Sequence, residues 1–582
     1  MLDQLQNKLS IKRLFPKTPR LYFRPADSVC TCAGKLTVHK THTRTIACLT
    51  LGEFIAHLTQ LICVDCGQIV KDKTLDQVVS PKSQFGFDVI VYVGEALFIH
   101  HQSDAQIQGL LQEKNITISL REIAYLGKKF ILYLALCHQA CSEPIKQHMQ
   151  SNGGYILHLD GTCEGNSPHL MSTLDGMTHI VLDNIKVPSE HSLPLIPFLK
   201  RVQSTYGDPI AAVHDMSAAI ITAVESVFPE TKDFICHFHF LRDIGKDLFG
   251  FEYNNIRRYL STFKTRALLR KMTRDLKCYI VQDKALNSAL KNYLKSDELE
   301  KSDNQLPAPI LVYLLVSWVL EAKTESRGYG FPFDRPHLYF CLNLQEAYPM
   351  LCALKCQLPP AAPQLLMAAI SRALNDQALT QSIRLMQEKI IVFDQLRDAM
   401  RIALPCAHQG LKDEGDQSIK TIEARVRAFR YSQNIEQLAS RHMAYQKMVK
   451  QIDKYWEKLF ADPIEIQTKD ATLSIQPQRT NNIMETFFRD IKHDGRKKAG
   501  TSSLSKALKS MLANTPLVKN LAIPKYREII LAGKDNLAER FADIDIRLVR
   551  DALKQEEEEA GKYPKGMAKV FRISHLPKKL SI

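Results

Sequence analysis

The sequence Tyr155-Ile156-Leu157-His158-Leu159-Asp160-Gly161-Thr162 decides the fold. Its apolar run is typical of a buried strand, and the Asp-Gly pair that closes it indicates a tight turn. We therefore expect a strand that carries the Asp160 carboxylate at its end. Because Asp-Gly turns are common and mostly structural, the interpretation depends on the residues that follow.

Six further elements follow this strand. Their patterns predict two strands, a helix, a strand, a second helix and a fifth strand, at residues 169–173, 179–182, 192–206, 209–213, 218–228 and 233–238. The predicted order is therefore β-β-β-α-β-α-β, and the fourth strand also ends on a carboxylate, Asp215. Asp175 is placed like a hairpin turn and Asp183 like a loop, so Asp160 is kept as the first acid.

This order is that of a ribonuclease H-like core, in which the first and fourth strands lie side by side. Asp160 and Asp215 would then converge, and two such carboxylates repel each other unless a cation lies between them. A carboxylate pair of this kind holds Mg²⁺ for in-line attack on a phosphodiester. From about residue 26 to about residue 515 the chain resembles a prokaryotic DDE transposase, closest to insertion-sequence and Mutator-like transposases with a long helical insertion.

A third acid is expected on a helix that returns to the sheet. At 3.6 residues per turn, one face of such a helix would carry Asn481, Asn482, Glu485 and Arg489. Asn-Asn-x-x-Glu followed by Phe-Arg resembles the final-Glu helix of many insertion-sequence transposases. The resemblance implies that Glu485 is the third metal ligand; the alternative is a plain surface glutamate.

Two close cysteine pairs predict a zinc site near the N-terminus. Cys30-Thr-Cys32 and Cys63-Val-Asp-Cys66 suit a tetrahedral Zn²⁺ site of the ribbon type, because each pair can sit on a tight knuckle. His39, His42 and Cys48 lie between the pairs and could replace one ligand. The alternative is that these cysteines are small buried apolar residues.

The next stretch predicts helices that could contact DNA. Ser103-Asp-Ala-Gln106 and Ser119-Leu-Arg-Glu122 match the capping-box pattern and open two short helices around residues 114–118. This arrangement fits a helix-turn-helix, with Arg121 and Lys128 on the second helix placed to meet phosphates. A structural helical linker is the alternative.

Cys236-His237-Phe238-His239 follows the fifth strand and resembles a signature of Mutator-like transposases. The resemblance implies that Cys236 and His239 lie beside the acids, as Asn482 would. By chemistry alone, a buried strand end whose polar groups are satisfied internally is the better interpretation.

Basic residues on predicted helices are further candidates for DNA contacts, with solvated helix faces as the alternative. They are Arg257, Arg258, Arg489, Lys492, Arg496 and Lys497. Gly328-Tyr-Gly-Phe-Pro-Phe333 could stack on unpaired bases, but a packed turn is preferred.

Composition limits the classes of protein to which the chain can belong. The chain has 582 residues, 77 Lys and Arg against 62 Asp and Glu, and a net charge of +15. This positive charge favours a polyanionic partner, and a merely basic surface is the alternative. No apolar run reaches the roughly 18 residues that a membrane span needs, and the start lacks the apolar centre of a signal peptide. We therefore expect a cytoplasmic, nucleoid-associated protein with no membrane partner.

The expected fold class is multidomain α/β. The expected parts are a basic arm, a zinc-ribbon-like domain, a helix-turn-helix-like region, the first part of the ribonuclease H-like core, a helical insertion, the final-Glu helix and a C-terminal tail, at residues 1–25, 26–75, 76–148, 149–250, 251–465, 466–515 and 516–582.

The resemblance implies an insertion-sequence DNA transposase that uses two Mg²⁺ or Mn²⁺ ions held by Asp160, Asp215 and Glu485, with a structural Zn²⁺. Its partners would be double-stranded DNA, as terminal inverted repeats and target, and further copies of itself in a homodimer or larger assembly. The alternatives are a ribonuclease H-like nuclease without strand transfer and a transposase-derived DNA-binding protein without catalysis.

Overall fold

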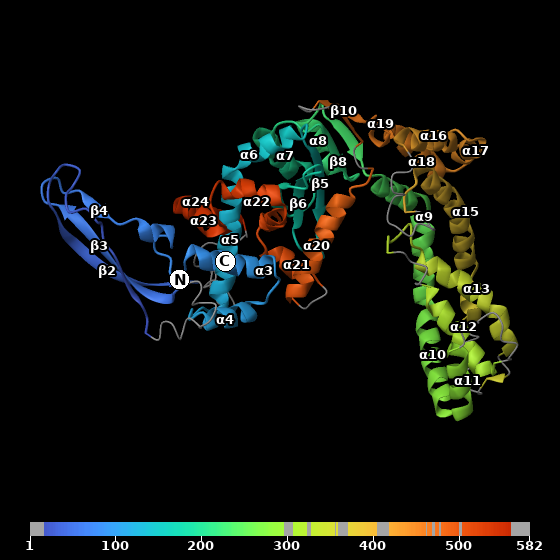
Figure 1. Ribbon diagram of the computed structural model, residues 1–582. Coiled ribbons are helices and arrows are strands. Elements are labelled where there is room, and N and C mark those ends of the chain that lie inside the picture. Colours follow the sequence, from blue (N-terminus) through green and yellow to red (C-terminus); the bar gives the residue numbers. More distant parts are fainter. Residues whose placement is uncertain are drawn as a thin grey trace, which may run out of the picture. The chain divides into compact units, whose positions relative to one another are not determined.

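The structure is a computed structural model (Figure 1). It describes residues 17–295, 306–322, 328–354, 357–358, 370–403, 418–460, 462–467, 472–476, 479–499 and 503–559. The chain divides into two compact units, Met1–Asp233 with Pro463–Ile582, and Phe234–Asp462. The finer seven-part division remains a prediction. No helix among the described residues combines the length and the apolar character that crossing a membrane requires.

The first unit begins with a sheet built around a long hairpin. Its strands are β1 (Arg20–Phe23), β2 (Leu36–Cys48), β3 (Gly52–Cys63) and β4 (Ile69–Lys71). β3 pairs with antiparallel β2, parallel β1 and antiparallel β4. Small apolar clusters lie at the two ends of the hairpin, one around Phe54 and the other around Leu61. The middle of β2 is exposed, so the ends carry most of the buried apolar surface.

Helices follow this sheet, as predicted. They are η1 (Thr74–Gln77), α3 (Phe87–Phe98), α4 (Asp104–Glu113), α5 (Leu120–Ala140) and α6 (Ser142–Ser151). The capping box at the start of α4 is confirmed, since the Ser103 hydroxyl accepts from the Gln106 N–H and the Gln106 side chain accepts from the Ser103 N–H. Ser119 caps α5 through the Glu122 N–H. With 21 residues, α5 is longer than the short second helix expected, because its apolar stripe continues into the core.

A five-stranded mixed sheet forms the centre of the first unit. The strands of this sheet and the two helices that connect them are, in chain order, β5 (Ile156–Thr162), β6 (His169–Asp175), β7 (Val181–Val187), α7 (Ser192–Tyr206), β8 (Ala211–His214), α8 (Ala218–Val227) and β9 (Lys232–Ile235). The strand order is β7-β6-β5-β8-β9, with β6 antiparallel to both neighbours and β8 parallel to β5. The predicted element order and the adjacency of the first and fourth strands are therefore confirmed.

The predicted fifth strand is too long. β9 ends at Ile235, and α9 (His237–Thr262) begins two residues later. Phe238, Leu241 and Ile244 are buried at helical spacing, which explains why this stretch is the start of a helix rather than the end of a strand.

The remaining elements of the first unit complete its core. They are β10 (Ile464–Gln467), β11 (Thr472–Ile475), α20 (Asn482–Ala499), α21 (Ser505–Ser510), η4 (Thr515–Ala522), α22 (Pro524–Leu531), α23 (Leu537–Ala542) and α24 (Ile546–Glu559). Tyr526 and Phe541 are fully buried, and the Tyr526 hydroxyl lies 2.9 Å from His138 Nδ1. Within the described residues 516–559, this segment thus contributes to the main core.

The second unit is helical. Its helices are α9, α10 (Thr265–Gln282), α11 (Lys284–Lys295), α12 (Ala308–Leu320), α13 (Pro336–Leu354), α15 (Gln377–Met400), α16 (Ile419–Arg430), α17 (Gln433–Arg441), α18 (Met443–Lys454) and α19 (Trp456–Leu459). Phe333 is buried and stacks on Phe238 with ring centroids 4.7 Å apart. Phe331 stacks on Tyr253 at 4.3 Å. The aromatic loop is therefore a packed turn, the interpretation that the sequence favoured.

Candidate functional site

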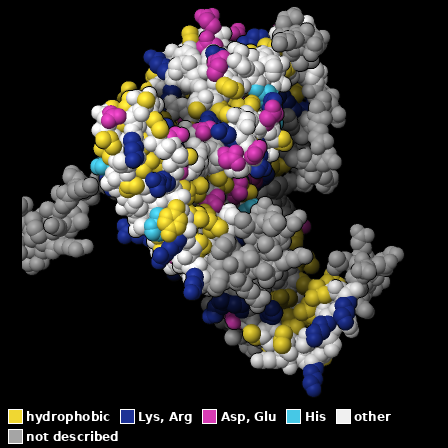
Figure 2. All heavy atoms as spheres, turned by 60° about the vertical axis from the view of Figure 1, so that its left-hand side comes forward, with side chains coloured by type: hydrophobic (Ala, Val, Ile, Leu, Met, Phe, Trp, Pro, Cys, Tyr) yellow, Lys and Arg dark blue, Asp and Glu magenta, His cyan; other side chains and the backbone are white. Residues whose placement is uncertain are grey.

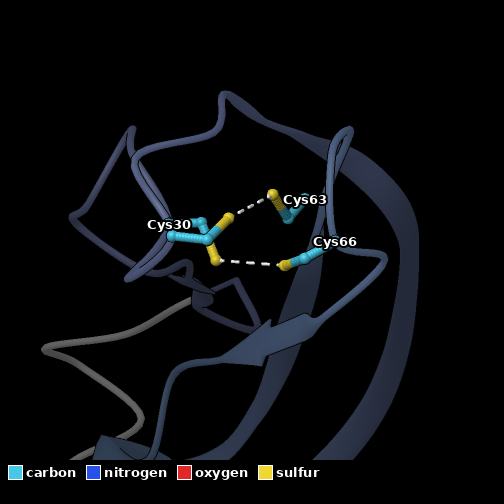
Figure 3. A group of neighbouring side chains, drawn as sticks. Cys30, Cys63 and Cys66 are labelled. Atoms are coloured by element: carbon cyan, nitrogen blue, oxygen red, sulfur yellow. Dashed lines mark hydrogen bonds between the residues drawn. The ribbon is translucent and has the colours of Figure 1, made fainter.

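Four cysteines meet at one end of the N-terminal sheet. Cys30 and Cys32 precede β2, Cys63 ends β3, and Cys66 lies in the turn before β4. The Sγ atoms of Cys30 and Cys66 are 3.6 Å apart, those of Cys32 and Cys63 are 3.4 Å apart, and all four lie within 4.8 Å of one another (Figure 3). A disulfide would need about 2.05 Å, whereas sulfurs about 2.3 Å from a tetrahedral Zn²⁺ lie roughly 3.8 Å apart. The predicted cysteines are thus brought together, and the cluster could bind zinc.

Two tight turns present these thiols. The Cys30 N–H donates to the Gly34 carbonyl at 2.8 Å, and the Gly67 N–H donates to the Cys63 carbonyl at 3.0 Å. Gly67 has a φ of +72°, the left-handed conformation that favours glycine. The Cys63 N–H also donates to the Gln68 carbonyl at 2.9 Å, which closes the second turn. Local backbone geometry therefore aims each pair at a common centre.

The pKa values of the four thiols are shifted in different directions. The backbone N–H of Cys32 lowers the pKa of Cys30, and the backbone N–H of Cys66 lowers the pKa of Cys63. Backbone N–H groups two residues further on also act to lower the pKa of Cys32 and Cys66, but other thiols of the cluster and burial together outweigh them and raise both pKa values. The cluster therefore favours partial negative charge, which a bound dication would neutralise.

The substitute ligands considered from the sequence are placed elsewhere. Cys48 is buried at the other end of the hairpin, in the apolar cluster around Phe54. His39 and His42 lie on the exposed middle of β2. Among the described residues, the metal-sized cluster contains the four cysteines and none of these three.

The predicted acids converge at one edge of the central sheet. Leu159 pairs with His214 across the parallel strands β5 and β8, so the residues that follow them, Asp160 within β5 and Asp215 just after β8, come at the same edge. Glu485 lies in the first turn of α20, which packs against β5. Strand pairing and helix packing thus bring three carboxylates that are far apart in the sequence to the same edge of the sheet.

The neighbouring carboxylates affect the pKa of Asp160. Burial raises the pKa of Asp160 well above its usual value, and the carboxylates of Asp215, Glu485 and Glu190 raise it further, while the Gly161 N–H opposes them. Keeping several neighbouring carboxylates ionised costs free energy unless a cation lies between them. Hard carboxylate oxygens are the ligands that Mg²⁺ and Mn²⁺ prefer. The donor set therefore fits divalent metal, although these oxygens are less closely gathered than the four sulfurs.

The two rival aspartates have structural roles. Asp175 is fully buried and accepts hydrogen bonds from the backbone N–H groups of Ile156, Met177 and Thr178, each at 3.0 Å. Asp183 forms an ion pair with Arg201 at 2.6 Å. These contacts occupy both carboxylates and leave Asp160 as the acid that faces Asp215 and Glu485.

Sequence reasoning missed two histidines and a glutamate near these acids. His214 is fully buried, with Nε2 2.6 Å from the Asp233 carboxylate and Nδ1 2.6 Å from the Asp215 carbonyl. Burial lowers the pKa of His214, but the Asp233 carboxylate together with the Asp215 carbonyl and carboxylate outweighs burial, so the pKa is raised. Glu190 lies just after β7, at the same edge of the sheet, with its Oε2 3.8 Å from His169. A polar residue within an apolar strand, as His158 and His214 are, was the available signal.

The predicted neighbours of the acids have different outcomes. Cys236 and His239 belong to the helical unit, at the start of α9, and their proximity to the acids remains a prediction. Burial lowers the pKa of His239 to about 4. On the final-Glu helix, Asn482 is exposed and Asn481 is buried, because the helix begins at Asn482 and Asn481 turns inward ahead of it.

Most predicted DNA-contact residues are exposed. Lys492 is half-buried, and the exposed ones are Arg121, Lys128, Arg257, Arg258, Arg489, Arg496 and Lys497. On the face drawn in Figure 2, Lys and Arg side chains are scattered among apolar and uncharged ones rather than joined into one patch. These residues are available to phosphates, and their role in binding DNA remains a prediction.

Comparisons with known proteins add little. No family model matches the chain, and no curated protein matches it. Among solved structures, the chain is similar to one described as the Drosophila P element transposase strand transfer complex, with 10% sequence identity and a TM-score of 0.30, over 79% of this chain and 94% of that chain. Likeness at this level decides neither the fold nor the function, which must be inferred from the chain's own residues.

Proposed function

We propose that this chain is a DDE DNA transposase of an insertion sequence, with a ribonuclease H-like core interrupted by a helical insertion. One observation carries the proposal: the parallel pairing of β5 and β8 brings Asp160 and Asp215 to one sheet edge, where α20 adds Glu485. The sheet order β7-β6-β5-β8-β9 is the order expected of that core. The zinc cluster and the basic helices would serve recognition of DNA ends.

In this proposal the three carboxylates hold two Mg²⁺ or Mn²⁺ ions. When bound, the ions would activate a water or a DNA 3′-hydroxyl and stabilise the leaving oxygen. Asp160, Asp215 and Glu485 would supply the oxygen ligands; Asp160 is buried, and the other two are partly exposed. The reaction needs no side-chain nucleophile, so we expect no covalent protein–DNA intermediate.

Cleavage of a supercoiled plasmid that carries the coding sequence with its own flanking DNA tests this function. With Mg²⁺ or Mn²⁺, wild type is expected to cut at the flanks, and Asp160→Asn, Asp215→Asn and Glu485→Gln to lose at least about 1,000-fold in rate while still binding DNA. Asp183→Asn is the matched control, because Asp183 is a carboxylate of the same sheet that pairs with Arg201.

Three outcomes would change the proposal. Normal cutting by Glu485→Gln would remove Glu485 from the ligand set. Binding without cutting by wild type would favour a transposase-derived binding protein. Cutting without joining of precleaved ends to target DNA would favour a nuclease.

A further inference from the structure

Asn481 connects the strand that carries the first acid to the helix that carries the third. It is fully buried, its Nδ2 donates to the Leu159 carbonyl at 3.2 Å, and its Oδ1 lies 2.8 Å from His158 Nδ1. A carbonyl can only accept, so the amide nitrogen must face Leu159 and the amide oxygen must face His158. The side chain therefore holds the two residues that immediately precede Asp160.

The backbone of the same residue begins the first turn of α20. The Asn481 carbonyl accepts from the N–H of Met484 at 3.0 Å and from the N–H of Glu485 at 3.1 Å. One residue thus joins the backbone of Glu485 to the backbone next to Asp160. A slip of α20 by one residue would break the side-chain contacts and turn Glu485 by about 100° around the helix axis.

His158 is itself held firmly. It is buried within β5, and a Cβ at Gly176 would lie 2.6 Å from its Nε2. The turn after β6 therefore closes over the imidazole and leaves room for it only because residue 176 is glycine. The partner that receives Asn481 has little freedom to move.

We propose that Asn481, held by His158 and Leu159, is the positioning residue that sets Glu485 opposite Asp160 and so completes the divalent-metal site. The inference rests on the proposed function, because it names how that same site is assembled across 325 residues, from Asp160 to Glu485. Asn481 does not hold metal or DNA; it acts through the placement of the helix.

The chain offers a matched control for the loss of a buried amide. Asn520 is also fully buried; its Nδ2 donates to the Val181 carbonyl at 2.9 Å and its Oδ1 accepts from the Val181 N–H at 2.8 Å. It joins η4 to the start of β7, at the edge of the sheet opposite the acids. Asn520→Leu removes the same groups without touching α20.

The experiment compares full-length Asn481→Leu and Asn520→Leu with wild type. Both are expected to lower the melting temperature by similar amounts. Only Asn481→Leu is expected to weaken Mn²⁺ binding, measured by electron paramagnetic resonance of free Mn²⁺ without DNA, and to slow plasmid cleavage by about 100-fold, the loss expected when a reacting group is displaced by about 1 Å. Asn520→Leu should keep both within about twofold of wild type, at temperatures where it is folded.

A second pair of variants covers the case in which Asn481→Leu does not fold. His158→Gln keeps an N–H donor for Asn481, whereas His158→Leu removes it. Mn²⁺ affinity and cleavage should therefore be better preserved in His158→Gln.

The inference is overturned if Asn481→Leu binds Mn²⁺ like wild type, or if Asn520→Leu loses Mn²⁺ binding equally. It is also overturned if the two His158 variants are indistinguishable. Wild type that binds Mn²⁺ but never cuts would end the proposed function alone, since Mn²⁺ affinity still tests the positioning role. Wild type that neither cuts nor binds Mn²⁺ would end both.

Discussion

The cysteine cluster and the carboxylate edge are both candidate metal centres, but they are assembled in opposite ways. The four cysteines come from residues 30–66 and are aimed by two local turns beside a small apolar cluster. The three acids come from residues 160–485 and meet through strand pairing and helix packing around the main core. A local site must gain much of its stability from the ion, whereas a site assembled by the core exists before the ion arrives.

Metal removal should show this difference most strongly. Structural zinc contributes on the order of 10 kcal/mol to small zinc domains. We therefore expect Cys63→Ser to abolish zinc binding and to remove hydrogen-exchange protection from β2 and β3, while protection of β5 and β8 persists. Zinc content and exchange measured by mass spectrometry check both points.

Cys48→Ala is the control for that experiment, since Cys48 is a buried cysteine of the same hairpin outside the cluster. It should retain zinc. Full exchange protection in metal-free Cys63→Ser would show that the hairpin is stable without the ion and would break the comparison.

Removing a charge at the carboxylate edge should stabilise the metal-free protein, whereas removing a cysteine of the cluster should destabilise the hairpin. Asp160 has a pKa raised by burial and by Asp215, so the folded protein binds its proton more tightly than the unfolded chain does. The stability that comes from binding this proton is complete below the pKa of Asp160 in the unfolded chain, near 3.8. It is lost as the pH rises through the pKa of Asp160 in the folded protein. In EDTA at pH 8, Asp160→Asn should therefore be more stable than wild type, by on the order of 1–3 kcal/mol.

Thermal unfolding between pH 4 and pH 8 measures this difference, which should shrink towards pH 4 and reverse when Mn²⁺ is added to wild type. A variant that is less stable than wild type at pH 8 without metal would contradict the prediction. It would mean that the acid edge is stabilised by other contacts.

The smallest expected effect comes from a glycine at a cysteine turn. A Cβ at Gly67 meets nothing within 4 Å, but its φ of +72° strains any other residue by roughly 1 kcal/mol. Gly67→Ala should therefore weaken zinc binding about fivefold in a chelator competition. Gly207→Ala also has open space, but the φ of +85° and ψ of −169° at that position are adopted almost only by glycine, so it should cost more stability and still leave zinc affinity unchanged. Equal zinc affinity in Gly67→Ala and wild type would show that this turn does not set the cluster.

Sequence reasoning predicted what depends on local pattern. The alternation of strands and helices after Tyr155, the Ser103 capping box and the two cysteine pairs are all confirmed, because each is encoded within a few residues. It extended the fifth strand too far, since apolar residues at the start of α9 fit either a strand or a helix until packing decides.

Sequence reasoning could not separate neighbouring residues with similar patterns. It preferred Asn482 to Asn481, because the start of a helix is uncertain by a residue or two and only packing shows which amide turns inward. It assigned no role to the segment after residue 515, where short helices with few apolar residues each contribute Tyr526 and Phe541 to the core.

The sequence by itself determined which residues could act: the acid in β5 and the acid just after β8, the glutamate of a predicted helix, and two cysteine pairs with metal-ligand spacing. Only the tertiary structure decided which of them meet. Strand order and the burial of Asn481 are long-range properties, since they depend on free energies summed over the whole core. The cysteine cluster needs only its turns, and the carboxylate edge needs the whole fold.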